Sequence, residues 1–293
     1  MTDTPKLKMR SWLFAPGDSE RKMQKASDSE ADIVLLDLED SVMPENKPEA
    51  RRLVSAFIAA RSDRHRIWVR INPITSEFAE DDLAAIMPSA PGGILLPKSE
   101  GSRDPERLDE LLTQHEQNHG IEPGSTRVAA LVTETPHAMF HTGDYEGLPR
   151  LTAMSWGAED LSSAIGASVQ FQPNGQYMPV FELARSLCLL GAVAAGAAPI
   201  ETIQADFRDL DGLRERALMV RSQGYRGMLA IHPAQVPVIN QAFTPSEAEL
   251  EKARAVIAAF AANPGAGTVG VDGAMLDRPH LALAHALLAS AED

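Results

Sequence analysis

Two acidic residues stand where apolar, strand-like runs end. Glu134 closes the run RVAALVTE, and Asp160 follows LTAMSWGAE. A buried run has little reason to end on a carboxylate unless that end opens onto solvent, a metal ion or a substrate. Two carboxylates with water and substrate oxygens suit Mg²⁺, whereas the lack of histidine at ligand spacing disfavours zinc. The alternative is that both residues cap the helices that follow their strands.

An arginine and an acidic cluster end two further runs. Arg70 lies near the end of RIWVRIN, and DIVLLDLED ends on Asp37, Glu39 and Asp40. An arginine that faces inward must be paired or must bind an anion, because burying an unpaired charge is costly. Two interpretations therefore stay open: Arg70 holds a carboxylate ligand bidentately, or it pairs internally with Asp37 or Glu39. The acidic cluster can hold metal-bound waters or pair with nearby basic side chains.

Other candidate motifs favour structural roles. Gly17 lies between a strand and a helix, where backbone N–H groups can face an anion, but the chain contains neither GxxxxGK[ST] nor GxGxxG. The single cysteine, Cys188, excludes an internal disulfide and a cysteine zinc cluster. Its small-residue apolar surroundings predict a packed core thiol rather than a nucleophile.

These residues are positioned by strand-like runs that alternate with amphipathic helical segments. This alternation is typical of βαβ units and a parallel sheet, whose site lies at the carboxyl ends of the strands. About eight runs are present, the number that closes a (β/α)₈ barrel. The predicted strands are residues 11–16, 32–38, 66–72, 93–98, 127–134, 151–157, 199–205 and 227–232.

The pattern changes after about residue 237. TPSEAELEKARAVIAAF predicts a strong helix, because Thr244 or Ser246 can cap it and acidic residues fill its first turn. A glycine-rich stretch and a last helix at 280–290 follow. We therefore expect a catalytic barrel over residues 1–236 and a cap or arm over 237–293, too small for a large core of its own and packed on a neighbouring subunit.

Composition bounds the class of protein. The 293 residues are 44% hydrophobic and 23% charged, as in an ordinary globular chain, with a net charge of −14. This charge argues against a general nucleic-acid or anionic-membrane surface. The N-terminal MTDTPKLKMRSW has no apolar signal region, and the apolar stretch near residues 187–200 is too short to span a bilayer. We expect a cytoplasmic protein.

An ordered set of strings resembles a known family. The strings are SWLFAPGDSERKMQKA, VLLDLEDSV, KPEAR, VRIN, LLPKSE, the strand that ends at Glu134, SWGAEDL, YRGMLAIHPAQ and GAMLDRP. Together they resemble the citrate lyase β-subunit-like family of the HpcH/HpaI aldolase superfamily, which includes malyl-CoA and citramalyl-CoA lyases. The resemblance spans nearly the whole chain, from Arg10 to about Leu288.

The resemblance implies a TIM barrel with Mg²⁺ at its C-terminal face, in trimers or hexamers. Further implied roles fall on residues that match the family's motifs. Glu134 and Asp160 would be the metal ligands, and Arg70 would clamp the carboxylate of a 2-oxo acid with help from the backbone amides of Gly157, Ala158 and Glu159. Asp37 and Glu39 would contact and orient these residues rather than bind the ligand themselves. Asp277 would act as an acid/base residue in a neighbouring subunit's site, although composition alone makes it a turn residue.

The implied reaction is Mg²⁺-dependent carbon–carbon cleavage of a malyl-CoA- or citramalyl-CoA-like thioester to a 2-oxo acid and an acyl-CoA. Three alternatives stay open: a malyl-CoA thioester hydrolase, a β subunit of citrate lyase that uses an acyl-carrier protein, and a non-enzymatic 2-oxo-acid-binding protein. One departure is Met228, where many relatives have lysine, so no role is expected for a lysine there.

Overall fold

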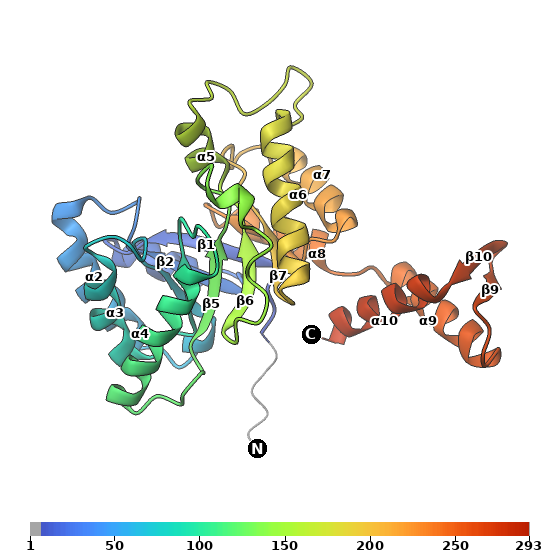
Figure 1. The fold of residues 1–293 in the computed structure, drawn as a ribbon, viewed down its shortest axis with the longest axis horizontal. Helices are drawn as coiled ribbons and strands as arrows, with labels where there is room; N and C mark the ends of the chain where they lie inside the picture. The colour runs from blue at the N-terminus through green and yellow to red at the C-terminus, as the bar shows by residue number, and fades with distance from the viewer. Residues whose placement is uncertain (1–6, 293) are drawn as a thin grey trace.

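The computed structural model describes residues 7–292 and contains a closed barrel of eight parallel strands in the order β1 to β8 (Figure 1). This confirms the predicted (β/α)₈ barrel. The strands are β1 (Ser11–Pro16), β2 (Ile33–Asp37), β3 (Ile67–Arg70), β4 (Gly93–Leu96), β5 (Arg127–Leu131), β6 (Leu151–Ser155), β7 (Ala198–Glu201) and β8 (Gly227–Ala230).

Helices connect the strands and surround them. The α-helices of this part are α1 (Glu20–Ser27), α2 (Lys47–Ala59), α3 (Ala79–Ile86), α4 (Arg103–His119), α5 (Ala158–Ile165), α6 (Pro179–Ala194), α7 (Leu210–Gln223) and α8 (Gln235–Phe243). Short 3₁₀ turns are η1 (Pro44–Asn46), η2 (Arg64–Arg66), η3 (Met87–Ser89) and η4 (Ala138–Phe140).

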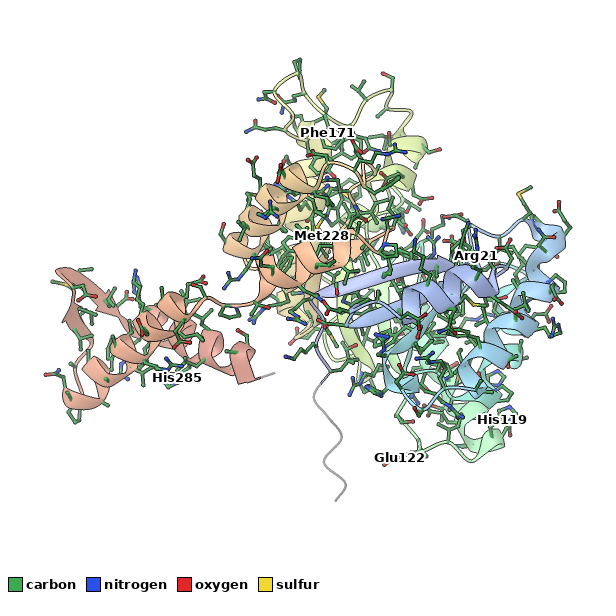
Figure 2. All side chains as sticks on the ribbon, turned by 180° about the vertical axis from the view of Figure 1, so that it is seen from behind. Arg21, His119, Glu122, Phe171, Met228 and His285 are labelled. Carbon is green, nitrogen blue, oxygen red and sulfur yellow. The ribbon has the colours of Figure 1, made fainter. Side chains whose placement is uncertain are left out.

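The strands are buried on both faces, which is why their sequences are continuous apolar runs rather than alternating ones. One apolar cluster fills the barrel and includes Trp12, Trp68 and Leu131. A larger cluster packs between barrel and helices and includes Met154, Cys188 and Met228. Met228 of β8 is completely buried in this outer layer (Figure 2), so a side chain at this position points away from the barrel interior.

Every strand except β1 ends earlier than the sequence predicts, and two of these ends, those of β4 and β5, bear on the site. β4 ends at Leu96 rather than Lys98, because Lys98 adopts a left-handed backbone conformation with φ of 50°. β5 ends at Leu131 rather than Glu134. Both predicted strand ends are therefore loop residues above the barrel, where side chains have more freedom to turn toward a ligand.

After the barrel, the chain forms an arm of α9 (Glu247–Ala262), β9 (Thr268–Val271), β10 (Ala274–Asp277) and α10 (Arg278–Glu292). The arm extends away from the barrel, and its hairpin lies at the far end (Figure 1). A capping box between Ser246 and Glu249 starts α9. A small apolar cluster that includes Phe260 and Ala284 holds α9, α10 and the hairpin together. None of the helices within residues 7–292 is long and apolar enough to cross a membrane.

The predicted boundary between residues 236 and 237 falls inside α8. This helix packs on α7, β1 and β8, and its Val236 and Ile239 are completely buried in the outer layer of the barrel. We therefore propose that the barrel unit ends with α8, at Phe243, and that the arm begins at Thr244.

Candidate functional site

A cavity of about 330 Å³ opens at the carboxyl ends of the barrel strands. Charged and apolar side chains both line it. Its lining comes from at least six strands or the loops after them and includes Phe14, Asp37, Asp40, Arg70, Leu131, Glu134, Trp156, Gly157, Glu159, Asp160, Thr202 and Leu229. In a barrel of this type the carboxyl end is where ligands bind.

Arg70, the last residue of β3, pairs with acidic residues from the neighbouring strand. Its Nε lies 2.7 Å from Oδ1 of Asp37, and its Nη2 lies 2.7 Å from Oδ2 of the same carboxylate. Its Nη1 lies 2.8 Å from Oε2 of Glu39. The guanidinium carbon lies 4.9 Å from the ring centre of Phe14. Nη1 also donates to Oδ2 of Asp40 at 3.5 Å. A guanidinium has five N–H groups, so these four contacts leave at least one for a ligand in the cavity.

Asp37 is held as a charged partner of Arg70. The parallel register pairs Asp37 with Arg70 directly, which brings the two side chains together. Backbone N–H groups of Glu39 and Ser41 also donate to the Asp37 carboxylate. Burial acts to raise the pKa of Asp37, but attraction and hydrogen bonding from Arg70 lower it below its usual value. The internal ion pair that the sequence left open is therefore present.

Lys98 links three acidic residues at the mouth of the site. Its Nζ lies 2.6 Å from Oε1 of Glu39, 3.3 Å from Oδ1 of Asp160 and 3.4 Å from Oδ1 of Asp40. Burial raises the pKa of Glu39 to about 7 despite the positive charges of Arg70 and Lys98. Lys98 was not among the predicted site residues. The available signal was its place in the string LLPKSE, where it closely follows an apolar run.

Glu134 is a buried carboxylate that lines the cavity and is 3% exposed. Its Oε2 accepts a 2.6 Å hydrogen bond from the backbone N–H of Lys98. Burial, with the charges of Asp160 and Glu39 nearby, raises the pKa of Glu134 to about 8. Like charges thus gather around this side chain, and a cation bound there would relieve their repulsion.

Asp160 approaches the cavity from the first turn of α5, a helix that Gly157 caps. A Cβ atom added to Gly157 would lie 2.6 Å from Oε1 of Glu134, so only glycine allows the two segments to approach this closely. The amides of Gly157, Ala158 and Glu159 lie at the N-terminus of α5. Such N–H groups have no acceptor within their own helix and favour an anion.

The donor set fits a hard cation that keeps water or ligand oxygens. Within residues 7–292 no group of three or more His, Cys, Asp or Glu side chains is arranged to hold a metal ion. Glu134 and Asp160 line the same cavity, and neither is joined by a histidine or cysteine there. Two carboxylates without nitrogen or sulfur donors match Mg²⁺, which is bound through one or two carboxylates plus other oxygens.

Asp277 lies apart from the other predicted residues. It ends β10, directly before α10, is half-exposed, and forms a 2.5 Å contact with Nδ1 of His280. It is absent from the lining of the cavity that contains Arg70 and Glu134. The structure of one chain therefore brings together every predicted site residue except Asp277.

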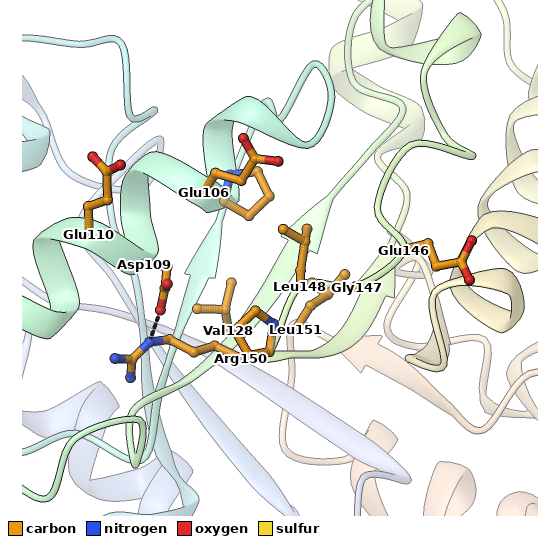
Figure 3. Close-up of a pocket in the computed structure, with 11 residues that line it drawn as sticks. Glu106, Asp109, Glu110, Val128, Glu146, Gly147, Leu148, Arg150 and Leu151 are labelled. Carbon is orange, nitrogen blue, oxygen red and sulfur yellow. Dashed lines mark hydrogen bonds and ion pairs between the residues drawn. The ribbon is translucent and has the colours of Figure 1, made fainter.

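A second cavity, of about 380 Å³, opens at the other end of the barrel, near the starts of β5 and β6 (Figure 3). Acidic side chains such as Glu106 and Glu146 surround an apolar floor. Arg150 at its edge is already engaged by Asp109, Glu116 and Thr113. This cavity contains none of the predicted site residues.

The chain is similar to several known proteins. A model of the HpcH/HpaI aldolase/citrate lyase family matches residues 10–233. A (3S)-malyl-CoA thioesterase of Cereibacter sphaeroides is 34% identical over 286 residues, which cover 97% of this chain and 94% of the relative. A citrate lyase subunit beta-like protein of Mycobacterium tuberculosis is 34% identical over 277 residues, covering 94% and 93%.

Solved structures are similar to this chain, one of them over nearly its full length. Crystallised CitE of Mycobacterium tuberculosis, in complex with magnesium, acetoacetate and coenzyme A, superposes with a TM-score of 0.81 at 32% identity. The match covers 98% of this chain and 99% of CitE. A citrate lyase beta subunit of the same organism, complexed with oxaloacetate and magnesium, has a TM-score of 0.71 at 32% identity and covers 81% of this chain and 98% of its own.

Proposed function

The chain belongs to the HpcH/HpaI aldolase/citrate lyase family, which confirms the predicted resemblance, and we propose that it is a Mg²⁺-dependent carbon–carbon lyase. It cleaves a malyl-CoA- or citramalyl-CoA-like 3-hydroxyacyl thioester to a 2-oxo acid and an acyl-CoA. The observation that carries this proposal is the convergence of Arg70, Glu134 and Asp160 on one cavity at the carboxyl ends of the strands.

In this proposal each side chain has a separate task. Glu134 and Asp160 hold Mg²⁺, which when bound polarises the oxygen of the carbonyl that forms as the bond breaks. The remaining donor capacity of the Arg70 guanidinium and the amides of Gly157, Ala158 and Glu159 bind the carboxylate of the 2-hydroxy acid portion. A substrate fixed at its carboxylate keeps the breaking Cα–Cβ bond aligned.

Apolar residues of the cavity face the rest of the substrate. Leu131, Trp156 and Leu229 line the cavity and exclude water from the reacting atoms. Cleavage removes a proton from the hydroxyl and leaves an enolate of the acyl thioester, which must then be protonated. We assign both proton transfers to Asp277 of a neighbouring subunit, whose carboxylate takes the hydroxyl proton and returns it to the enolate carbon, since Asp277 lies outside the cavity of its own chain.

The assignment of Asp277 implies a homo-oligomer, and we include a trimer or hexamer in the proposal. The arm supports it. Met275 and Leu283 are 79% and 69% exposed, and the arm's own apolar cluster is small. Exposed apolar side chains on an extended arm are suited to a second copy of the chain. The family resemblance further suggests a cytoplasmic enzyme whose partners are a 2-oxo acid and a CoA or acyl-carrier-protein thioester.

A second candidate is a malyl-CoA thioester hydrolase, because a relative 34% identical over 97% of this chain has that name. The same cavity would then direct water to the thioester carbonyl and release free malate and coenzyme A. A third is the β subunit of a citrate lyase complex, which the citrate lyase subunit beta-like relative favours. The products separate these reactions.

The test is a panel of malyl-, β-methylmalyl-, citramalyl- and citryl-CoA incubated with the purified protein and Mg²⁺. We expect release of glyoxylate, pyruvate or oxaloacetate with an equal amount of acyl-CoA, and loss of this release in chelator. Free malate without a 2-oxo acid would establish the hydrolase instead. If only carrier-protein thioesters react, the protein is a β subunit.

Variants of the two carboxylates test the metal assignment. Glu134→Gln and Asp160→Asn should each lower product release by about 10²-fold or more and weaken Mn²⁺ binding measured by electron paramagnetic resonance. Glu106→Gln, at the cavity on the other side of the barrel, is the matched control and should change neither. Full activity of Glu134→Gln in chelator would refute the metal assignment.

A further inference from the structure

A buried lysine lies next to the segments that follow β2 and β3. Lys47, the first residue of α2, is 5% exposed. Its ammonium lies 2.8 Å from the carbonyl oxygen of Leu38, 3.0 Å from that of Glu39 and 2.8 Å from Oδ1 of Asn72. An ammonium has three N–H groups, so these acceptors satisfy all of them.

The acceptors of Lys47 belong to the two segments that form the arginine site. Leu38 and Glu39 directly follow β2, and the carboxylates of Asp37 and Glu39 both pair with Arg70. Asn72 lies two residues after Arg70, just beyond β3. Lys47 therefore joins the end of β2 to the end of β3. None of its atoms lines the cavity.

Further buried polar groups extend this connection. Asn72 donates to Oδ2 of Asp82 through both its backbone N–H, at 2.8 Å, and its side-chain amide, at 2.7 Å. The other oxygen of the completely buried Asp82 accepts a 2.7 Å hydrogen bond from Nε of Arg51. The four side chains of Lys47, Asn72, Asp82 and Arg51 form one continuous chain of hydrogen bonds, which we call the buried support.

We propose that the buried support is a positioning device, in which Lys47 fixes Arg70 and its acidic partners in the geometry that receives the carboxylate of the 2-oxo acid. The inference rests on the proposed function. It also gives a shared role to two of the strings that carry the family resemblance. Lys47 and Arg51 belong to KPEAR, and Asn72 belongs to VRIN.

The physical reason lies in the mobility of strand-end loops. Arg70 is shared among three carboxylates from residues 37–40, and a small shift of that segment would turn the guanidinium away from the cavity. Lys47 binds two successive carbonyl groups of this segment and so restricts its movement. It does so without placing another charge in the cavity. Buried groups that orient ligand-binding residues are commonly worth 10–100-fold in affinity or activity.

Lys47→Met tests the inference, because methionine keeps much of the side-chain volume and removes the three hydrogen bonds. In the condensation direction we expect KM for the 2-oxo acid to rise by about tenfold or more, with KM for the acyl-CoA unchanged. Calorimetric titration with pyruvate and with oxaloacetate, each in the presence of Mg²⁺, should show the same loss of affinity. Asn72→Ser, a milder change in the same chain, should shift both values in the same direction.

Arg150→Met is the matched control, since Arg150 is an equally buried cation in a hydrogen-bonded group at the opposite end of the barrel (Figure 3). It should lower the midpoint of urea unfolding and leave 2-oxo acid affinity unchanged. The inference is overturned if Lys47→Met binds both oxo acids as wild type does, or if Arg150→Met weakens binding equally. Failure of wild type to bind either oxo acid would instead contradict the proposed function.

Discussion

The backbone N–H of Lys98 donates a 2.6 Å hydrogen bond to Oε2 of Glu134, and Lys98 adopts a left-handed φ of 50° where it does so. Non-glycine residues rarely hold this conformation, and it costs a lysine roughly 1–2 kcal/mol. Lys98, in the loop after β4, therefore has a strained backbone conformation, and its N–H orients the carboxylate of Glu134, which follows β5. Strain of this kind concentrates at functional sites.

Two substitutions of Lys98 separate its backbone from its ammonium. Lys98→Gly and Lys98→Ala both remove the side-chain charge, but only glycine relieves the left-handed strain. We expect Lys98→Gly to be more stable than Lys98→Ala by about 1 kcal/mol, measured by urea unfolding. Equal stability of the two variants would show that φ at this position is not left-handed in solution.

Gly157→Ala should displace Glu134, because the added methyl group would lie 2.6 Å from Oε1 of that side chain. The φ of Gly157 is −120°, which alanine adopts readily, so steric conflict is the main effect. We expect Mn²⁺ affinity and product release to fall by about 10–100-fold. Gly143→Ala is the control, since a Cβ atom there meets nothing within 4 Å. Similar losses in both variants would contradict the close packing at Gly157.

The stability of the metal-free protein should fall as pH rises from about 5 to about 8. The folded-state pKa values of Glu134 and Glu39 are raised to about 8 and about 7, above their ordinary value of 4.5. In this window the folded protein holds protons that the unfolded chain has released, so raising the pH favours unfolding. Urea unfolding in chelator at several pH values measures the slope.

Glu134→Gln supplies the comparison for this pH dependence. The variant cannot release a proton at position 134, so its stability should decline less steeply between pH 5 and 8. Glu39 remains in the variant and preserves part of the slope. An identical slope in wild type and Glu134→Gln would show that Glu134 does not titrate in this window.

Asp277 can be tested by mixing subunits. Arg70→Met and Asp277→Asn should each be nearly inactive alone, the first through loss of the oxo-acid carboxylate and the second through loss of the acid/base group. If Asp277 acts in a neighbouring subunit, oligomers assembled from both variants contain some sites with an intact Arg70 and an intact Asp277. Co-expressed, differently tagged subunits should therefore regain part of the wild-type activity.

The two single variants provide the controls for this experiment. Asp277→Asn should bind pyruvate with Mg²⁺ as tightly as wild type, since the variant keeps Arg70, Glu134 and Asp160. Sedimentation of the mixed sample measures the oligomer. A mixed oligomer without regained activity would remove Asp277 from the site, and a monomer would contradict the proposed assembly.

The fold was predictable because its signals are local. Continuous apolar runs such as IVLLD and GILL indicate strands buried on both faces, and their alternation with helices leaves few topologies. Strand ends were less predictable. In the sequence, Lys98 and Glu134 extend the apolar runs. In the structure they lie in the loops after β4 and β5, where they contact each other.

The sequence by itself determined that Arg70, Glu134 and Asp160 stand at strand ends, because parallel strands in a closed barrel bring those ends to one face. The tertiary structure decided how each charge is compensated. Arg70 pairs with Asp37 through strand register, and Lys98 reaches three carboxylates from separate segments. These contacts join residues far apart in the chain, so their partners follow from packing in three dimensions rather than from spacing along the sequence.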